Sequence, residues 1–237
     1  MLNTTPLHLY LDENLLLSLP ALQIAPGEVL TLMGPSGCGK SSLLGALAGV
    51  LPPRGPIRLE GDIRQGERLL TSLPPQTRRI GMLFQDDLLF AHLTVAENLM
   101  FGMPATLKGA AARRAKTLDT LAEVALVDQA DKLPGALSGG QRARVSLLRA
   151  LLAEPRALLL DEPFSRLDKP LRAAFRTLVF ERLTALGIPA ILVTHDEEDA
   201  PGAILHLTPP RTSPHLTSPH PTMLIDREGD SSCLTAI

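Results

Sequence analysis

The chain has 237 residues, of which 45% are hydrophobic and 20% are charged. This composition is globular and excludes a chain that is disordered throughout. The formal net charge of −2 provides no dense basic face, so we expect no nucleic-acid partner. No Lys or Arg precedes Lys40, which argues against a secretory signal, and no apolar run approaches the roughly 20 residues that a membrane span needs. Cys38 and Cys233 are too few for a disulfide scaffold, so we expect a soluble, cytosolic protein.

Short apolar runs alternate with helical patterns along the chain. Residues 7–24 alternate between strand and turn patterns and predict a separate antiparallel sheet at the edge of the fold. Four apolar runs predict buried strands at Val29–Met33, Ile80–Phe84, Ala157–Leu160 and Ala190–Thr194. Because strands and helices alternate, we expect an α/β fold with a mostly parallel core sheet and helices on both faces.

The middle of the chain has a different pattern. Residues from about 86 to 152 carry almost no strand signal and predict a helical insertion in the α/β domain. Thr94 followed by Glu97 predicts a capping box at the start of a short helix. Residues 109–126 then predict a longer amphipathic helix.

The composition changes again after Leu207, where Pro, Ser, Thr and His become frequent. We therefore expect one domain over residues 1–207, with the helical subdomain inserted at 86–152. The tail, 208–237, is expected to be disordered, although MLIDREGD at 223–230 is compatible with one strand and turn.

Residues 34–41 read GPSGCGKS, which is the phosphate-binding loop pattern. The loop follows a predicted strand and opens a predicted helix at 40–48, as the pattern requires. Backbone N–H groups of such a loop face the phosphates, Lys40 reaches the β- and γ-phosphates, and the Ser41 hydroxyl can ligate Mg²⁺. We therefore expect ATP and Mg²⁺ as cofactors. The expected nucleotide-binding residues are Gly34, Pro35, Ser36, Gly37, Cys38, Gly39, Lys40, Ser41 and Ser42.

Residues 157–163 read ALLLDEP and place two carboxylates at the end of a buried strand. Ligands of open α/β sheets bind at the carboxyl ends of the strands. We expect Asp161 to join the Mg²⁺ shell, and Glu162 to polarise the water that attacks the γ-phosphate. A solvated acidic turn is the alternative for these residues when they are considered without the phosphate loop.

The segment 137–141 reads LSGGQ and precedes a predicted helix at 142–153. Together with the phosphate loop, this pentapeptide resembles the signature of ABC-type ATPases, and the resemblance covers about residues 7–200. Three stretches, LTLMGPSGCGKSS, PATLKG and LSGGQ through SRLD, look most similar to a bacterial importer-like subtype whose transported substrate is poorly defined.

The resemblance implies roles for further residues. Gln85 matches the Q-loop glutamine, which contacts Mg²⁺ and the attacking water, His195 matches the switch histidine, and Asp168 matches the D-loop. Lys40, Gln85, Glu162 and His195 form the implied catalytic set, and Ser41, Gln85 and Asp161 form the implied metal site. The signature residues implied to bind the nucleotide of a second copy are Ser138, Gly139, Gly140 and Gln141.

The resemblance also implies an ATP hydrolase that works as a head-to-tail dimer. It implies transmembrane permease subunits and a periplasmic substrate-binding protein as partners, and a peripheral location on the cytoplasmic face of the inner membrane. A soluble ABC ATPase of DNA repair or translation and a regulatory ATPase that transports nothing are the alternatives. A phosphate-loop kinase would not need LSGGQ.

Three features remain open at this point. Adenine is expected to stack on Tyr10 or to pack against Leu11, and Tyr10 is the better candidate for a core residue. The apolar stretch 84–101 is either a groove for a helix of the permease or core of the helical insertion. Arg166 stands in the D-loop where many relatives carry a small residue.

Overall fold

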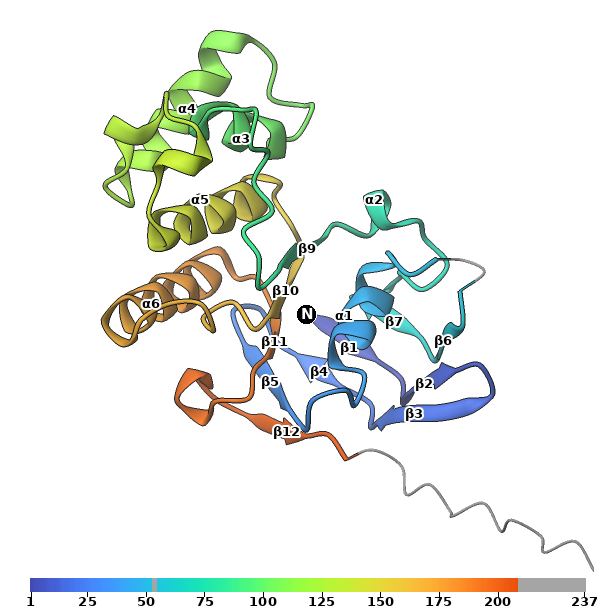
Figure 1. Ribbon diagram of the computed structural model, residues 1–237. Helices are drawn as coiled ribbons and strands as arrows, with labels where there is room; N and C mark the ends of the chain where they lie inside the picture. Colours follow the sequence, from blue (N-terminus) through green and yellow to red (C-terminus); the bar gives the residue numbers. More distant parts are fainter. Residues whose placement is uncertain (53–54, 209–237) are drawn as a thin grey trace, which may run out of the picture.

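The computed structural model describes residues 1–52 and 55–208 (Figure 1). Apart from residue 208, the predicted tail 208–237 lies outside the described residues. The core is a sheet of five parallel strands, and β12 is a strand that the sequence pattern did not predict. In spatial order the strands are β12 (Ile204–His206), β5 (Val29–Met33), β11 (Ala190–Val193), β10 (Ala157–Asp161) and β9 (Ile80–Leu83).

Two small antiparallel sheets lie beside the core sheet. The strands predicted over residues 7–24 are antiparallel, as expected, but they divide between two sheets instead of forming one, because the first of them pairs with residues 57–60 and the last with residues 2–3. One sheet contains β3 (Asn14–Leu19), β2 (Leu7–Leu11) and β6 (Ile57–Glu60) in that order. The other contains β4 (Gln23–Ile24), β1 (Leu2–Thr4), β7 (Ile63–Gln65) and β8 (Arg68–Leu69).

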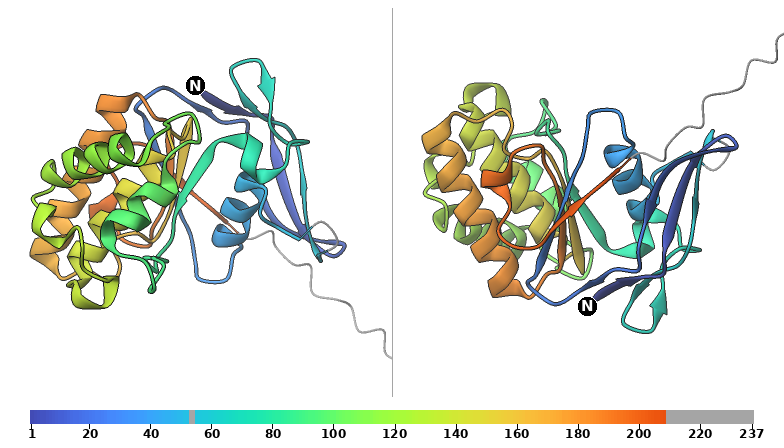
Figure 2. Two further views of the ribbon diagram at one scale, coloured as in Figure 1. Left: turned by 90° about the horizontal axis from the view of Figure 1, so that it is seen from above. Right: turned by 90° about the horizontal axis from the view of Figure 1, so that it is seen from below.

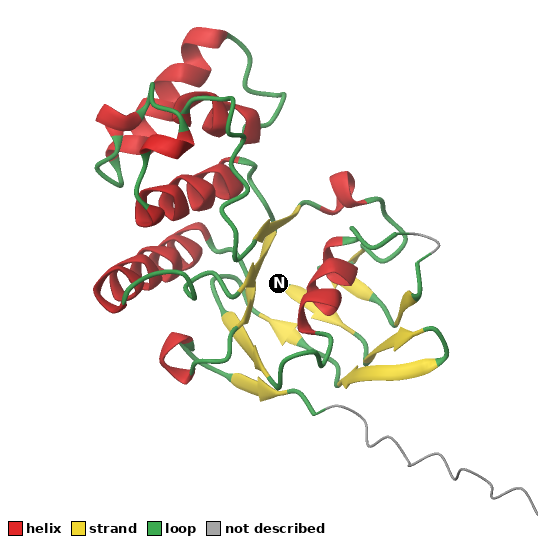
Figure 3. Ribbon diagram, in the orientation of Figure 1, coloured by secondary structure: helices red, strands yellow, loops and turns green. Residues whose placement is uncertain are grey.

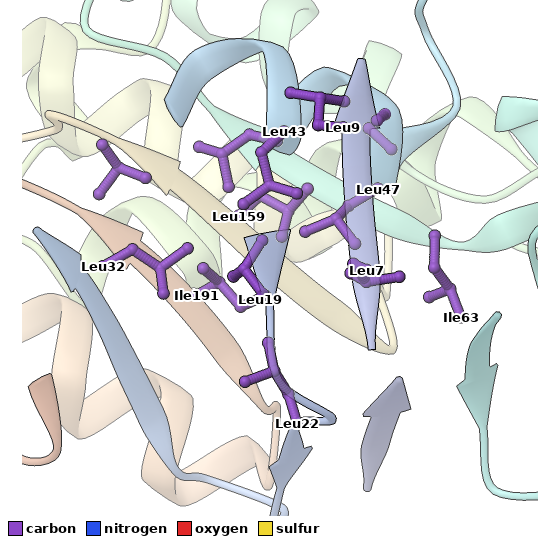
Figure 4. Packing of buried hydrophobic residues seen from close by; sticks show 14 of the residues in the cluster. Leu7, Leu9, Leu19, Leu22, Leu32, Leu43, Leu47, Ile63, Leu159 and Ile191 are labelled. Carbon is purple, nitrogen blue, oxygen red and sulfur yellow. The ribbon is translucent and has the colours of Figure 1, made fainter. Parts of the chain in front are cut away.

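Helix α1 (Lys40–Ala48) lies between the core sheet and the antiparallel strands (Figure 1). Leu43 and Leu47 are fully buried in a cluster that also contains Leu7 of β2 and Leu159 of β10 (Figure 4). The helix is apolar on nearly all sides because both of its faces are covered. Its placement holds the phosphate loop against the core sheet.

The opposite face of the core sheet is covered by α5 (Gly139–Leu152) and α6 (Lys169–Leu186), as the views from above and below show (Figure 2). Leu158 and Leu160 of β10 pack there with Phe175 of α6. Successive side chains of β10 are buried on opposite faces of the core sheet. The strand therefore needs the uninterrupted apolar run ALLL. Helices thus cover both faces of the sheet, as predicted.

The segment between β9 and β10 is helical and contains α3 (Val95–Gly102), α4 (Ala110–Ala122) and α5 (Figure 3). The predicted capping box is present: the Glu97 amide donates to Thr94 Oγ1 at 3.2 Å, and the Thr94 amide donates to Glu97 Oε2 at 2.7 Å. Helix α4 ends before the predicted 126, because Ala125 has a left-handed φ of 56° that no helix accommodates. Elsewhere, α2 (Pro75–Arg78) precedes β9. None of the helices in the described ranges combines the length and the hydropathy needed to cross a bilayer.

Candidate nucleotide-binding site

The loop between β5 and α1 has the backbone of a phosphate cradle. Gly37 and Gly39 adopt φ values of 80° and 96°, which side chains with a Cβ rarely tolerate. A Cβ on Gly34 would stand 2.9 Å from the carbonyl oxygen of Leu207, so the segment after β12 packs directly against the loop. The glycines that the sequence pattern singled out are therefore required by this geometry.

Lys40 is held inside the loop and is only 9% exposed. Its Nζ donates hydrogen bonds of 2.8 Å to the carbonyl oxygens of Gly34 and Pro35, and it lies 4.0 Å from Sγ of the buried Cys38. The loop therefore curls around the ammonium group, which keeps the positive charge at its centre. A cavity of about 290 Å³ opens at this point; it is lined by Ser36, Gly37, Gly39, Lys40, Ser41, Ser42 and Glu162.

Asp161 lies at the carboxyl end of β10 and faces the start of α1. Burial raises the pKa of its carboxyl group above the ordinary value; the Glu162 carboxylate adds to the rise, whereas the Ser41 hydroxyl and the Lys40 ammonium oppose it. A desolvated carboxylate beside a hydroxyl oxygen suits Mg²⁺, which prefers oxygen ligands and typically takes one or two carboxylates together with phosphate oxygens. The described residues hold no cluster of three or more His, Cys, Asp or Glu side chains that could bind a metal ion.

Glu162 has a strained backbone. Its φ is 46°, and its amide donates to the carbonyl oxygen of Val193 at 2.9 Å, which joins the turn after β10 to β11. His195 follows β11, and its Nδ1 lies 3.4 Å from Glu162 Oε1. The structure thus brings together the two residues that the sequence predicted as base and switch, with Glu162 also lining the phosphate cavity.

Gln85 reaches the same edge of the sheet from β9. The parallel register pairs Leu83 with Leu160, so Gln85 and Glu162 each follow their strand by a similar distance. The Gln85 side chain is exposed. The register therefore supports the predicted neighbourhood, although no side-chain hydrogen bond joins Gln85 to Asp161 or Glu162 among the described residues.

The LSGGQ segment forms the N-terminus of α5, which begins three residues before the predicted helix. Ser138 is its N-cap: the Gln141 amide donates to Ser138 Oγ at 3.3 Å, and the Ser138 amide donates to Gln141 Oε1 at 2.9 Å. A Cβ on Gly140 would lie 2.2 Å from a methyl group of Leu171 of α6, so α5 approaches α6 closely here and the Leu171 side chain would have to move for any larger residue. None of these residues lines the phosphate cavity of the same chain, and α5 lies apart from α1 (Figure 1).

The register of β2 places the two candidate adenine contacts on opposite faces of the strand. Tyr10 pairs with Arg58 across the sheet, and the Arg58 guanidinium lies 4.5 Å from the ring centroid. Tyr10 is half-buried and is absent from the core, so the expectation of a core residue is wrong. Leu11 alternates onto the same face as the buried Leu9, which packs against Gly39 of the phosphate loop. Leu11 is itself 38% exposed at the end of β2, so neither candidate side chain belongs to the core.

Two supporting residues were not found by sequence reasoning. Arg78 is buried, and its guanidinium donates to the carbonyl oxygens of Ala46 and Leu47 at 2.9 and 2.8 Å. These bonds cap the C-terminal end of α1, whose last carbonyl groups have no partner within the helix. Asp199, only 2% exposed, accepts from the Thr194 hydroxyl at 2.9 Å and from Arg172 of α6, and so fixes the backbone beside His195. Neither residue lies in a recognisable motif, and only their long-range contacts identify them.

Comparison with known sequences agrees with this site. The profile of the ABC transporter family matches residues 17–165. YnjD of Escherichia coli (strain K12), an ABC transporter ATP-binding protein, is 48% identical over 201 residues, which cover 85% of this chain and 91% of that protein. This likeness agrees with the importer-like subtype predicted from the motif stretches.

Two import proteins are also similar. The sulfate/thiosulfate import ATP-binding protein CysA of Gloeobacter violaceus is 45% identical over 76% of this chain, and the Fe(3+) ions import ATP-binding protein FbpC of Rhizobium etli is 42% identical over the same share. The chain spans only 51% and 50% of these two relatives. The phosphate loop, the parallel sheet and these matches together establish that the chain belongs to the ABC transporter family as an ATP-binding, ATP-hydrolysing domain of the P-loop α/β class.

Proposed function

We propose that this chain is the ATP-hydrolysing subunit of a bacterial importer, in which two copies close head to tail around two MgATP molecules. The observation that carries the proposal is the separation of LSGGQ from the phosphate cavity of its own chain. Ser138 and Gly139 are exposed at the start of a 14-residue helix, where N–H groups and the helix dipole favour an anion. A second copy would supply that anion as the γ-phosphate on its own loop.

Each side chain then has a task in the composite site. Lys40 binds the β- and γ-phosphates, while Asp161, Ser41 and Gln85 hold Mg²⁺ together with phosphate oxygens. When bound, Mg²⁺ neutralises charge that develops on the transferred phosphoryl group. Glu162 orients and deprotonates the attacking water, and His195 holds the Glu162 carboxylate from the far side. We assign these tasks to a domain spanning 1–207, with 86–152 as its helical subdomain.

Light scattering tests the composite site directly. Glu162→Gln keeps the shape of the side chain but removes its charge, so MgATP should trap this variant as a dimer. Adding Ser138→Arg places a bulky cation at the seam and should return the trapped variant to a monomer that still binds ATP. A monomeric Glu162→Gln variant at saturating MgATP would contradict the head-to-tail arrangement.

An apolar groove next to Gln85 is the proposed contact with the permease. The cavity, of about 460 Å³, is lined in part by Met82, Leu88, Phe90, Phe101 and Arg149. Leu88 and Phe101 are 54% and 66% exposed, and the Phe90 ring packs edge-on against Phe101 at 4.7 Å between centroids. Such a groove suits a short amphipathic helix. The names of CysA and FbpC, both import ATP-binding proteins, support a permease as its source.

Co-purification from membranes tests the permease contact. Phe101→Asp should release the chain from membranes with its ATP binding intact. Val127→Asp, at another exposed apolar side chain outside the groove, is the matched control and should stay bound. We further propose that the chain sits peripherally on the cytoplasmic face of the inner membrane, and that a periplasmic substrate-binding protein serves the same permease. Equal retention of both variants would contradict the groove, and mass spectrometry of co-purified partners tests the rest.

A further inference from the structure

Two consecutive acidic residues after Gln85 are bound to two different loops of the site. The Asp86 carboxylate forms an ion pair with Arg166, which lies in the SRLD turn between β10 and α6. Asp87 Oδ2 accepts a hydrogen bond of 3.0 Å from Nε of Arg142, the residue directly after LSGGQ. The segment that follows Gln85 is therefore connected to both loops that face a second copy in the proposed dimer.

The contacts of Asp87 anchor this segment to α5. Its carbonyl oxygen accepts from Ser146 Oγ at 2.8 Å, and the next carbonyl, of Leu88, accepts from Arg149 Nη1 at 2.8 Å. Arg142 also donates through Nη1 to the carbonyl oxygen of Leu137, the first residue of LSGGQ, at 2.7 Å. These hydrogen bonds hold the backbone of residues 87 and 88 against α5, whereas the side chain of Asp86 contacts the SRLD turn.

The SRLD turn is also joined to the backbone of Glu162. Ser165 Oγ donates to the carbonyl oxygen of Glu162 at 2.8 Å, and the Ser165 amide bonds to the same oxygen. Arg166 comes immediately afterwards. The Arg166–Asp86 pair therefore links the turn that follows Glu162 to the segment that follows Gln85. Glu162 and Gln85 are the two residues expected on either side of the attacking water.

We propose that Arg166 and Asp86 are positioning residues that set the placement of Glu162 relative to Gln85. This inference rests on the proposed function and assigns a task to the arginine that departs from the usual D-loop. The side chains are 61% and 57% exposed, and an exposed ion pair contributes little to stability. The pair should therefore affect the geometry of hydrolysis far more than it affects folding.

Steady-state kinetics of a double-mutant cycle test the proposal. Arg166→Ala and Asp86→Ala should each lower kcat about tenfold, with the KM for ATP and the melting temperature almost unchanged. The double variant should be no worse than either single variant, because both remove one interaction. The swap Asp86→Arg with Arg166→Asp should recover several-fold in kcat. Arg64→Ala, which breaks a similarly exposed pair with Asp62 at 3.1 Å on an antiparallel sheet, is the control and should retain full activity.

Additive losses, a loss in Arg166→Ala alone, or an equal loss in Arg64→Ala would overturn the proposal. A second measurement is independent of ATP turnover. In the nucleotide-free chain, Arg166→Ala should speed amide hydrogen exchange in peptides covering 84–90, and Asp86→Ala should speed it in peptides covering 163–168. Unchanged exchange in both variants would also overturn it. Because exchange needs neither a dimer nor hydrolysis, a failure of the proposed function would leave this result intact.

Discussion

Replacing Glu162 by glycine should stabilise the fold while abolishing hydrolysis. Glu162 has a left-handed φ of 46°, which costs a residue with a Cβ about 1–2 kcal/mol. Glycine avoids this cost but loses about 0.5–1 kcal/mol through its freer unfolded state. The contact with His195 contributes little, since that side chain is 65% exposed. The free energy of unfolding should therefore rise by about 0.5–1 kcal/mol, whereas kcat should fall by about 10²-fold or more with the loss of the base.

Urea unfolding of the nucleotide-free chain and ATPase assays at saturating MgATP measure the two effects. Glu162→Ala separates them, because it removes the carboxylate but keeps the Cβ, and so should lose hydrolysis without gaining stability. Glu154→Gly is the matched control for strain away from the phosphate cavity: its φ is 50°, and its ion pair with Arg79 at 3.5 Å is exposed and contributes little. It should gain stability and keep its activity. A loss of about 1 kcal/mol or more in Glu162→Gly would refute the strain argument.

Other predictions concern charge and burial at the site. Burial raises the pKa of the Asp161 carboxyl group in the folded state, so its ionisation opposes folding. Asp161→Asn should therefore raise the free energy of unfolding at neutral pH, and this gain should vanish below the ordinary pKa of 3.8. Urea unfolding at several pH values measures both effects. Lys40→Ala should lose ATP binding at millimolar nucleotide with an unchanged circular dichroism spectrum, and retained binding would make the loop vestigial. Asp199→Ala should cost about 1–3 kcal/mol in urea unfolding, because the Thr194 hydroxyl and Arg172 lose their buried acceptor while Arg172 keeps its ion pair with Asp196 at 2.8 Å; an unchanged free energy of unfolding would contradict that account.

Local patterns predicted the phosphate loop and the elements that hold it. The predicted helix 40–48 and the strand Val29–Met33 coincide with α1 and β5, and the other predicted strands differ by one residue at their ends. These elements carry their own signals: glycines at left-handed positions, apolar runs bounded by polar residues, and a capping box at Thr94. Because the strands of the core sheet are parallel, their carboxyl ends meet at one edge, and this edge could be predicted without knowing the strand order.

Long-range pairing was out of reach of the same reasoning. Strand β12 has only three residues, and its place in the sheet depends on β5, which precedes it by about 170 residues. The left-handed backbone of Ala125 and Glu162 has no sequence signal, because neither residue is a glycine. The Arg166–Asp86 pair joins residues 80 positions apart, so the sequence identified Arg166 as unusual without indicating its partner.

Complementation between two inactive variants tests the head-to-tail site most directly. Ser138→Arg keeps an intact phosphate loop, and Lys40→Ala keeps an intact LSGGQ, so a mixed dimer contains one complete site. An equimolar mixture should hydrolyse ATP at up to about a quarter of the wild-type rate, which is the ceiling for random pairing, in which half of all pairs are mixed and each has one working site of two. The rate should rise with total protein concentration because association is bimolecular. A mixture that stays as inactive as its components, or a wild-type rate that is independent of concentration in a proven monomer, would contradict the account.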